Sequence, residues 1–593
     1  MQRKRYPGLS SGPSLLSKLV FGAVSALVLS ACAPAPVERE AYEPEAATGW
    51  RDQQLSFAEN YMVAAANPAA VEAGLAILRE GGTAIDAAVA VQAMLTLVEP
   101  QSSGIGGGAF ILYWDNETRA LHSLDARETA PMAATPELFL DEEGNAPRWI
   151  DAVVGGRSVG TPSVVRGLEV AHQRWGQVPW NRLFEETIEL AEVGFEVSPR
   201  LAELIALDFN PGLPRMPVAR DYFFPNGRAL QAGDIRKNPE LADTLRAIAE
   251  QGADALHYGP IAEDIVRAVQ ESPIAPGLLS MEDLAAYQPI WRDPVCGGYR
   301  VYQICSMGPP SSGGITLLQT LALLEPFDIA NLPVNGEAAL HYFTQASRLA
   351  FADRNRYIAD DDYVETPIDA LLNPDYLTLR SALIGEEDMG HAEAGDIGHF
   401  SRADDQSLEL PSTTHFSIID QYGNAVSMTS TIEMGFGSTV MTRGFLLNNQ
   451  LTDFSLVPEV DGVPVANRVE PGKRPRSSMS PVIVFDEAGD VLHVVGSPGG
   501  PRIINYVTQT VIGLLDWDLD MQAAINLPRI TNLNGATSLE QGTDIEGLKP
   551  LLEGRGHQVE IRSLNSGLHG ITRTAEGLEG GADPRREGSA QGH

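Results

Sequence analysis

The chain has 593 residues, a formal net charge of −36, 44% hydrophobic residues and a mean hydropathy of −0.09. This composition allows a large buried core beneath an ordinary soluble surface. The negative charge repels phosphate backbones and anionic lipid headgroups, so it disfavours nucleic-acid binding and charge-driven membrane binding.

The first 31 residues predict an export signal. Basic residues at positions 3–5 precede an apolar run over 15–30, and Cys32 follows directly after the small residue Ala31. This pattern resembles bacterial lipoprotein signals, which implies cleavage before Cys32 and acylation of that residue. Ala33 follows instead of Asp, a choice that in Gram-negative lipoproteins usually permits sorting to the outer membrane. We therefore expect an exported, periplasmic protein whose lipid anchor is its only contact with the membrane.

Residues 32–54 are rich in Pro, Glu and Ala without periodicity, which predicts a flexible tether. The folded part should begin near Leu55. Helical spacing of apolar residues over 67–79 and 84–98 predicts two packed helices separated by a glycine pair.

Two glycine-containing strings have rival interpretations. Residues 104–109 resemble a dinucleotide-binding loop, but they precede a predicted strand over 109–114 instead of following one, so close backbone packing explains them better. Residues 156–160 match the G-x-S-x-G nucleophile elbow. Pro162 lies where the elbow helix needs a backbone donor, which disfavours that site.

The middle of the chain is helix-rich. Amphipathic spacing predicts helices over 166–175, 180–193, 200–207, 239–250, 259–271, 281–287, 315–324 and 338–356. Cys296 and Cys305 lie on two β-rich runs that a hairpin could bring together. In an oxidising periplasm we expect a disulfide, with two free core thiols as the alternative. Their spacing fits neither a redox pair nor a zinc site, and we expect neither a metal nor a cofactor.

The stretch from 411 to 420 runs from a polar, proline-marked loop into a strand. Thr413 within it is a candidate nucleophile. If the bond between Ser412 and Thr413 is cut, the freed α-amine becomes a base on the same residue as the hydroxyl. A Ser/Thr-rich turn before a surface strand is the alternative for this string taken alone.

After Thr413 the chain reads as strands and hairpins. The turn at Gly423-Asn424 predicts a hairpin between strands over 416–420 and 425–431, and helices are predicted over 505–515 and 521–527. The glycine-rich, charged tail from Glu576 is expected to be partly disordered.

Six short clusters accompany Thr413. They are residues 124–131 (LDARETAP), 307–314 (MGPPSSGG), 431–433 (TIE), 446–455 (LLNNQLTDFS), 471–481 (PGKRPRSSMSP) and 496–502 (GSPGGPR). In this order they resemble the γ-glutamyltransferase (γ-glutamyltranspeptidase, glutathione hydrolase) family of N-terminal nucleophile hydrolases. The resemblance implies an α+β fold, a four-layer αββα sandwich. It also implies autocatalytic cleavage into a large subunit, 55–412, and a small catalytic subunit, 413–593, that share one core.

The resemblance also implies the catalytic roles. Thr413 would attack the substrate carbonyl with its own α-amine as the base, and Thr431 would orient it. Gly499 and Gly500 would offer backbone N–H groups to the oxyanion.

For the substrate, the resemblance makes Arg127 a bidentate clamp for an α-carboxylate, helped by Ser477 and Ser478. The alternative for Arg127 is a surface ion pair with Glu128 or Asp125.

Glu433, Gln450 and Asp453 would hold the α-ammonium. Glu433 stands where some family members have Asn, but it still accepts hydrogen bonds. The loop over 454–476 lacks the aromatic lid residue of some members, which predicts an open pocket and leaves the balance of hydrolysis and transpeptidation undecided.

The expected activity is transfer of a γ-glutamyl group from glutathione or a related small molecule to water, an amino acid or a peptide. Two alternatives stay open, a glutaryl-type (cephalosporin) acylase and a non-enzymatic surface lipoprotein. Arg127, Asp453 and the paired serines favour the first activity over the acylase, and the intact Thr413, Thr431 and glycine pair weigh against a non-enzymatic protein.

Overall fold

The computed structural model describes residues 50–593 except 208, 399, 408–409 and 411. The predicted signal, Cys32 and nearly all of the tether lie outside the described residues. Within the described part, no helix combines the length and the apolar character needed to cross a membrane.

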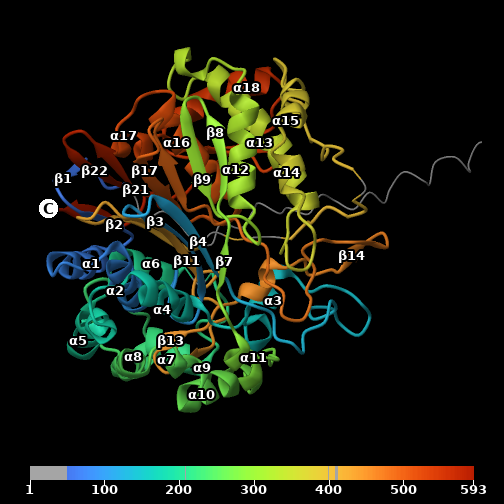
Figure 1. The fold of residues 1–593 in the computed structure, drawn as a ribbon. Helices are drawn as coiled ribbons and strands as arrows, with labels where there is room; N and C mark the ends of the chain where they lie inside the picture. The colour runs from blue at the N-terminus through green and yellow to red at the C-terminus, as the bar shows by residue number, and fades with distance from the viewer. Residues whose placement is uncertain (1–49, 208, 399, 408–409, 411) are drawn as a thin grey trace, which may run out of the picture. The chain divides into compact units, whose positions relative to one another are not determined.

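Two seven-stranded antiparallel sheets form the centre (Figure 1). The first has the order β23-β2-β10-β11-β3-β4-β7. Its strands are β2 (Met62–Ala65), β3 (Gly108–Asp115), β4 (Ala120–Ala126), β7 (Ile290–Arg292), β10 (Thr414–Ile419), β11 (Ala425–Thr431) and β23 (Ser589–Gly592).

The second sheet has the order β1-β22-β21-β17-β16-β9-β8. Its strands are β1 (Ser56–Ala58), β8 (Val295–Tyr299), β9 (Tyr302–Ser306), β16 (Val482–Phe485), β17 (Val491–Gly496), β21 (His569–Thr574) and β22 (Gly577–Ala582). Short strands outside these sheets are β5 (Phe195–Glu196), β6 (Ile235–Arg236), β12 (Met441–Thr442), β13 (Phe445–Leu446), β14 (Glu459–Val460), β15 (Val463–Pro464), β18 (Ile530–Thr531), β19 (Thr537–Glu540) and β20 (Val559–Arg562).

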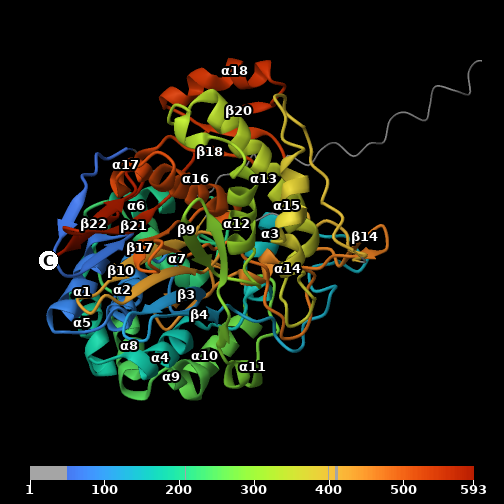
Figure 2. The same ribbon diagram turned by 45° about the horizontal axis from the view of Figure 1, so that its top comes forward.

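The two sheets pack face to face, with helices on both outer faces. Leu112 and Ile419 of the first sheet share a buried cluster with Ile483, Val494 and Ile571 of the second. The outer face of the first sheet packs on α1 (Pro68–Arg79), α2 (Ala84–Val98) and α4 (Val164–Trp175). That of the second packs on α12 (Gly313–Leu324), α16 (Ile503–Leu515) and α17 (Met521–Asn526), and α13 (Glu337–Tyr357) packs on α12. Figure 2 shows α16 and α17 over β17 and β21. The predicted four-layer α+β sandwich is confirmed.

The remaining helices lie around these layers. They are α3 (Trp149–Val153), α5 (Glu185–Val193), α6 (Pro199–Ala206), α7 (Pro217–Phe223), α8 (Pro239–Gln251), α9 (Asp254–His257), α10 (Gly259–Gln270), α11 (Met281–Ala286), α14 (Ile368–Leu371), α15 (Pro374–Ser381) and α18 (Lys549–Gly554). The 3₁₀ turns are η1 (Gly156–Ser158), η2 (Trp180–Phe184), η3 (Pro225–Gly227), η4 (Ile329–Asn331), η5 (Gln450–Asp453), η6 (Gly500–Arg502) and η7 (Asp544–Leu548). The helix predicted over 180–193 therefore divides into η2 and α5.

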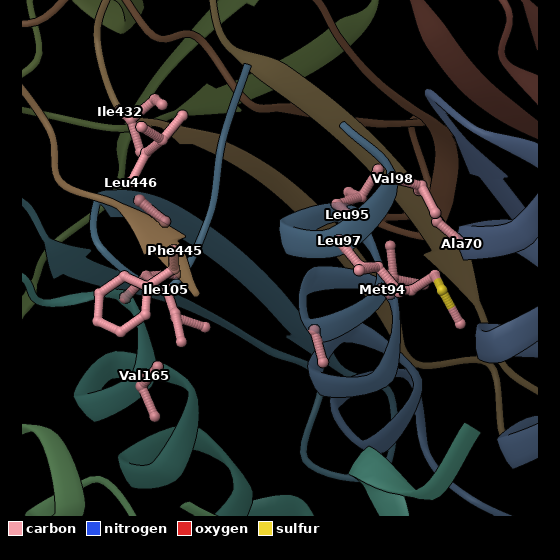
Figure 3. Close-up of a cluster of buried hydrophobic side chains, with 14 of the residues drawn as sticks. Ala70, Met94, Leu95, Leu97, Val98, Ile105, Val165, Ile432, Phe445 and Leu446 are labelled. Atoms are coloured by element: carbon pink, nitrogen blue, oxygen red, sulfur yellow. The ribbon is translucent and has the colours of Figure 1, made fainter. Parts of the chain in front are cut away.

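Local sequence explains the central helices. Asn67 accepts a hydrogen bond from the N–H of Ala69 and caps α1, and Thr83 forms a capping box with Asp86 at the start of α2. Every residue of α2 is buried, so this helix is stabilised by packing on all sides. Figure 3 shows Met94, Leu95 and Leu97 of α2 within the cluster of buried hydrophobic side chains that this helix helps to form.

The glycines after Ser103 serve close packing, as predicted. A Cβ on Gly106 would lie 2.1 Å from the carbonyl oxygen of Leu446, and one on Gly107 would lie 2.0 Å from that of Thr431. Ile105 packs beside Phe445 and Leu446 (Figure 3). Since β3 follows this loop, the dinucleotide reading is excluded.

The G-x-S-x-G string forms no nucleophile elbow. Ser158 is buried in η1, and its hydroxyl donates to the carbonyl oxygens of Val153 at 2.6 Å and Gly155 at 3.0 Å. Separately, a disulfide joins Cys296 and Cys305 across the β8–β9 hairpin.

The expectation of a partly disordered tail is wrong. β22 pairs with both β1 and β21, and β23 pairs with β2. The glycine-rich composition is weak evidence of disorder here because backbone pairing with strands distant in sequence stabilises the tail.

Candidate active site

The β10–β11 hairpin places Thr413 opposite Thr431. The register pairs Thr414 with Ser430, so the next residues outward on the two strands face each other. The two threonine hydroxyl oxygens lie 3.0 Å apart, within hydrogen-bond distance. Thr431 Oγ1 also accepts a hydrogen bond of 2.8 Å from the backbone N–H of Glu433. These contacts orient the Thr413 hydroxyl.

The backbone at Thr413 is strained. Its φ is +108°, a region that non-glycine residues rarely adopt, at a cost of about 1–3 kcal/mol. The side chain is 5% exposed. On the preceding residue, the Ser412 hydroxyl donates to the carbonyl oxygen of Gln101 at 3.1 Å. The junction between Ser412 and Thr413 is therefore buried and strained in the intact chain.

Arg127 follows the end of β4 and is 1% exposed, so a surface ion pair is excluded. Its Nη2 donates to the carboxylate of Asp453 and, at 3.1 Å, to the carbonyl oxygen of Arg476. Gln450 also donates to the Asp453 carboxylate, at 2.7 Å. Gln450 and Asp453 are the first and last residues of η5, so this turn brings both of these predicted binding residues to Arg127.

A second acid lies beside this pair. Glu433 is buried, has a φ of +79°, and its carboxyl accepts a hydrogen bond from the Asn449 side chain. Burial, and next the charge of Asp453, raise the pKa of Glu433 well above its usual value. Glu433 therefore holds a proton more readily than an ordinary glutamate does.

A third acid was not predicted as a site residue. Glu128 is fully buried, and among the described residues neither of its carboxyl oxygens has a hydrogen-bond partner. Arg127 Nη1 lies 3.9 Å from Glu128 Oε2. Burial raises the pKa of Glu128 to about 8 despite this cation.

The two predicted serines lie next to an arginine that the sequence analysis missed. Arg354, buried in α13, donates to the Ser478 hydroxyl at 2.6 Å and to the Ser312 hydroxyl at 2.9 Å. The Ser477 hydroxyl accepts from the N–H of Met479 at 3.1 Å. The sequence did show a basic residue within a helix predicted over 338–356, which could have marked it as a candidate site residue. The helix pattern gave no indication of its hydrogen-bond partners.

Gly499 and Gly500 lie at the N-terminal end of α16, where Gly500 is the first residue of η6 and Gly499 precedes it. Their φ values are +133° and +58°, and the first is a conformation that favours glycine. Backbone N–H groups and the positive end of a helix dipole together favour a developing oxyanion.

These residues surround one small pocket. It is lined by Arg127, Leu410, Thr413, Thr431, Glu433, Gln450, Asp453, Ser477, Ser478, Met479, Gly500 and Ile503. Gly499 adjoins this set without lining the pocket. Leu410, Met479 and Ile503 were not predicted as site residues.

The pocket is small in the intact chain, and the open pocket expected from the missing lid stays a prediction for the cleaved protein. The cavity volume is about 20 Å³, enough for about one water molecule. None of the described lining residues is aromatic, in line with the missing lid, but Leu410, just before the junction, helps to fill the space. Among the residues that the structure describes, no group of His, Cys, Asp and Glu could hold a metal ion.

Comparison with known proteins gives a consistent picture. The gamma-glutamyltranspeptidase family model matches residues 70–593. The glutathione hydrolase proenzyme of Bacillus subtilis (strain 168) is 38% identical over 555 residues, covering 91% of this chain and 92% of that protein. The glutathione hydrolase proenzyme of Escherichia coli (strain K12) is 36% identical, covering 97% and 98%. Among solved structures, a cephalosporin acylase from Bacillus halodurans superposes with a TM-score of 0.80 at 28% identity, covering 92% of this chain and 97% of that one.

The buried Glu128 predicts a pH-dependent stability. Burial raises the pKa of its carboxyl from 4.5 to about 8, so stability falls as pH rises between these values, by on the order of 5 kcal/mol. Glu128→Gln cannot ionise and should therefore gain stability relative to the wild type as the pH rises from 5 to 8.5. Urea unfolding midpoints measure the difference. Glu59→Gln, an exposed control, should track the wild type, and parallel curves for Glu128→Gln would contradict the assignment.

Proposed function

Because the chain belongs to the gamma-glutamyltranspeptidase family and is an enzyme of the glutathione hydrolase type, we propose that it cleaves the γ-glutamyl amide bond of glutathione and related compounds through an ester on Thr413. The observation that carries this proposal is the buried Thr413–Thr431 hydroxyl pair in one pocket with the Arg127–Asp453 ion pair.

The first step is autocleavage. The Thr413 hydroxyl attacks the carbonyl carbon of Ser412, the peptide C–N bond breaks as the acyl group moves from nitrogen to oxygen, and water hydrolyses the resulting ester. The products are a carboxylate at Ser412 and a free α-amine at Thr413. The strained φ of Thr413 supports this step because cleavage relieves the strain. The proenzyme names of the relatives are consistent with it.

Cleavage also opens the site. The pocket of the intact chain has no room for a glutamyl group, and Leu410, three residues before Thr413, lines it. Once the bond is cut, Leu410 is no longer linked through the chain to Thr413. Its side chain can then move out of the pocket. The same reaction thus creates the base and frees the space for the substrate.

Catalysis then follows the geometry. The Thr413 hydroxyl attacks the γ-carbonyl carbon and its proton passes to the α-amine. The oxyanion forms near the N–H groups of Gly499 and Gly500, and such a donor typically contributes about 3 kcal/mol. The amide bond breaks as the amine returns the proton to the leaving nitrogen. Water or an amino-acid amine then attacks the ester and releases the γ-glutamyl group.

The Arg127–Asp453 ion pair supports recognition of a zwitterion. The guanidinium and the carboxylate lie next to each other and carry opposite charges. The α-carboxylate of the substrate would pair with the guanidinium of Arg127, and the α-ammonium of the substrate would pair with the carboxylate of Asp453. Two buried ion pairs would then replace one. A glutaryl group, which has a carboxylate and no ammonium, would leave Asp453 without a cation.

The acylase remains the second candidate because a cephalosporin acylase shares the fold at 28% identity. The ammonium argument favours the γ-glutamyl donor. The enzymatic relatives give no support to a non-enzymatic surface lipoprotein. For location, we propose an exported lipoprotein anchored through Cys32 at the outer membrane, on the strength of the signal pattern alone.

Autocleavage predicts that Thr413→Ala stays a single chain, whereas the wild type gives two, because the variant lacks the attacking hydroxyl. A denaturing gel with intact-mass analysis measures the products. Thr414→Ala, which removes a neighbouring buried hydroxyl without a partner among the described residues, should still be cleaved. A wild-type protein that remains one chain yet hydrolyses a γ-glutamyl anilide would contradict the mechanism.

Substrate choice is tested with Asp453→Asn, which keeps a hydrogen-bonding side chain next to Arg127 and removes the charge. We expect kcat/KM on a γ-glutamyl anilide to fall about 100-fold, because a charged hydrogen bond worth about 3 kcal/mol is lost. On a glutaryl anilide we expect kcat/KM to fall less than tenfold. Equal losses of kcat/KM on the two substrates would mean that Asp453 only positions Arg127 and does not bind the α-ammonium. A wild-type preference for the glutaryl substrate would favour the acylase.

The anchor predicts that Cys32→Ser moves the protein from the membrane fraction to the soluble one. Fractionation of a Gram-negative host and mass spectrometry of the N-terminal peptide measure this. Ala33→Asp should stay membrane-bound but leave the outer-membrane fraction. Unchanged fractionation of Cys32→Ser together with no acyl mass on the wild type would rule out the lipoprotein.

A further inference from the structure

A second, larger cavity lies at the far end of β17 from the active site. β17 runs from Val491 to Gly496 toward the Gly499-Gly500 pair, whereas the cavity touches the first residues of that strand. Its volume is about 690 Å³, within the range of small-molecule sites. The lining residues that matter below are Leu492, His493, Leu519, Asp520, Arg573 and Glu579. None of them lines the Thr413 pocket.

Part of the cavity wall is apolar. Val491 and Leu514 are buried, and Leu492 and Leu519 are half-buried beside them. These side chains come from β17, from the end of α16 and from the loop that leads to α17. A ligand with a short hydrocarbon chain could bury apolar surface here, worth about 0.8 kcal/mol for each methylene group.

The rim carries excess negative charge. Five carboxylates line the cavity together with one guanidinium, that of Arg573. Asp490 is paired with Arg119, which lies outside the lining. Glu579 has no ion pair or side-chain hydrogen bond among the described residues, and its pKa is raised by partial burial and then by the charges of Asp520 and Glu576. The cavity therefore lacks a cation near Glu579.

One buried polar side chain opens into the cavity. His493 is 6% exposed, and its Nδ1 lies 2.9 Å from the Thr572 hydroxyl oxygen. Nε2 has no partner among the described residues, and it is not among the polar atoms sealed away from solvent, so it faces the cavity. Burial lowers the pKa of His493 to about 3, which keeps the ring neutral. A neutral imidazole nitrogen is suited to hydrogen-bond a polar group of a ligand.

We propose that this cavity is a binding site for a small linear diamine, with one ammonium at Glu579 and Asp520, the carbon chain on Leu492 and Leu519, and the second amine at His493 Nε2. The acidic protein as a whole also concentrates organic cations near its surface. The site is separate from the catalytic pocket and does not depend on the proposed reaction.

The test is calorimetric titration of the full-length protein with 1,6-diaminohexane, and with 1,6-hexanediol as the neutral analogue of equal length. We expect saturable binding of the diamine and none of the diol. Glu579→Gln should weaken binding at least tenfold, and Leu519→Trp, which fills the cavity from a half-buried position, should abolish it. Glu263→Gln, an exposed glutamate on α10 with the same change of charge, should bind as the wild type does.

Thermal unfolding followed by circular dichroism checks that each variant is folded, independently of any enzymatic activity. An amine bound at the Thr413 pocket would persist in Leu519→Trp because that pocket is untouched. Undiminished binding in Glu579→Gln and Leu519→Trp would therefore overturn the proposal. So would the absence of saturable binding by the wild type, or equal binding of the diol.

Discussion

The antiparallel pairing of β10 with β11 is the constraint on which the active site depends. It sets Thr413 against Thr431, and it places both strands in the middle of a sheet whose other central strands, β2 and β3, come from before the junction. A cut between Ser412 and Thr413 would leave these hydrogen-bonded ladders in place. The two parts would remain one core because each supplies strands that the other needs.

The electrostatics of the pocket follow from burying several acids around one cation. Arg127 faces Asp453, Glu128 and Glu433, and burial pushes the pKa values of the two glutamates upward. Proton binding by the two glutamates limits the negative charge that Arg127 would otherwise have to balance. The group formed by Arg127, Asp453 and the glutamates therefore stays close to neutral overall. A zwitterionic head group preserves that balance, whereas a singly charged one disturbs it. On the proposed function, selectivity for a zwitterion would derive from charge balance as well as from shape.

The sequence predicted what is local or carried by motifs. Helical periodicity located α1, α2, α12 and α13 within one or two residues, and the turn at Gly423-Asn424 located the hairpin. Periodicity could not reveal that Arg354 reaches Ser478 or that Leu410 fills the pocket, because both contacts join segments far apart in sequence. The tail was mispredicted for the same reason.

The pairing of the chain ends has a consequence for how the protein is made. Among the described residues β1 has β22 as its strand partner, and the backbone of His593 exchanges hydrogen bonds with Tyr61. β1 therefore stays without this partner until residues 577–582 are available to pair with it. The second sheet therefore closes only when segments more than five hundred residues apart in sequence have met, which makes this edge a late step of folding. Any extension appended after His593 would begin inside the sheet's edge contacts, which makes the C-terminus a poor place for a fusion.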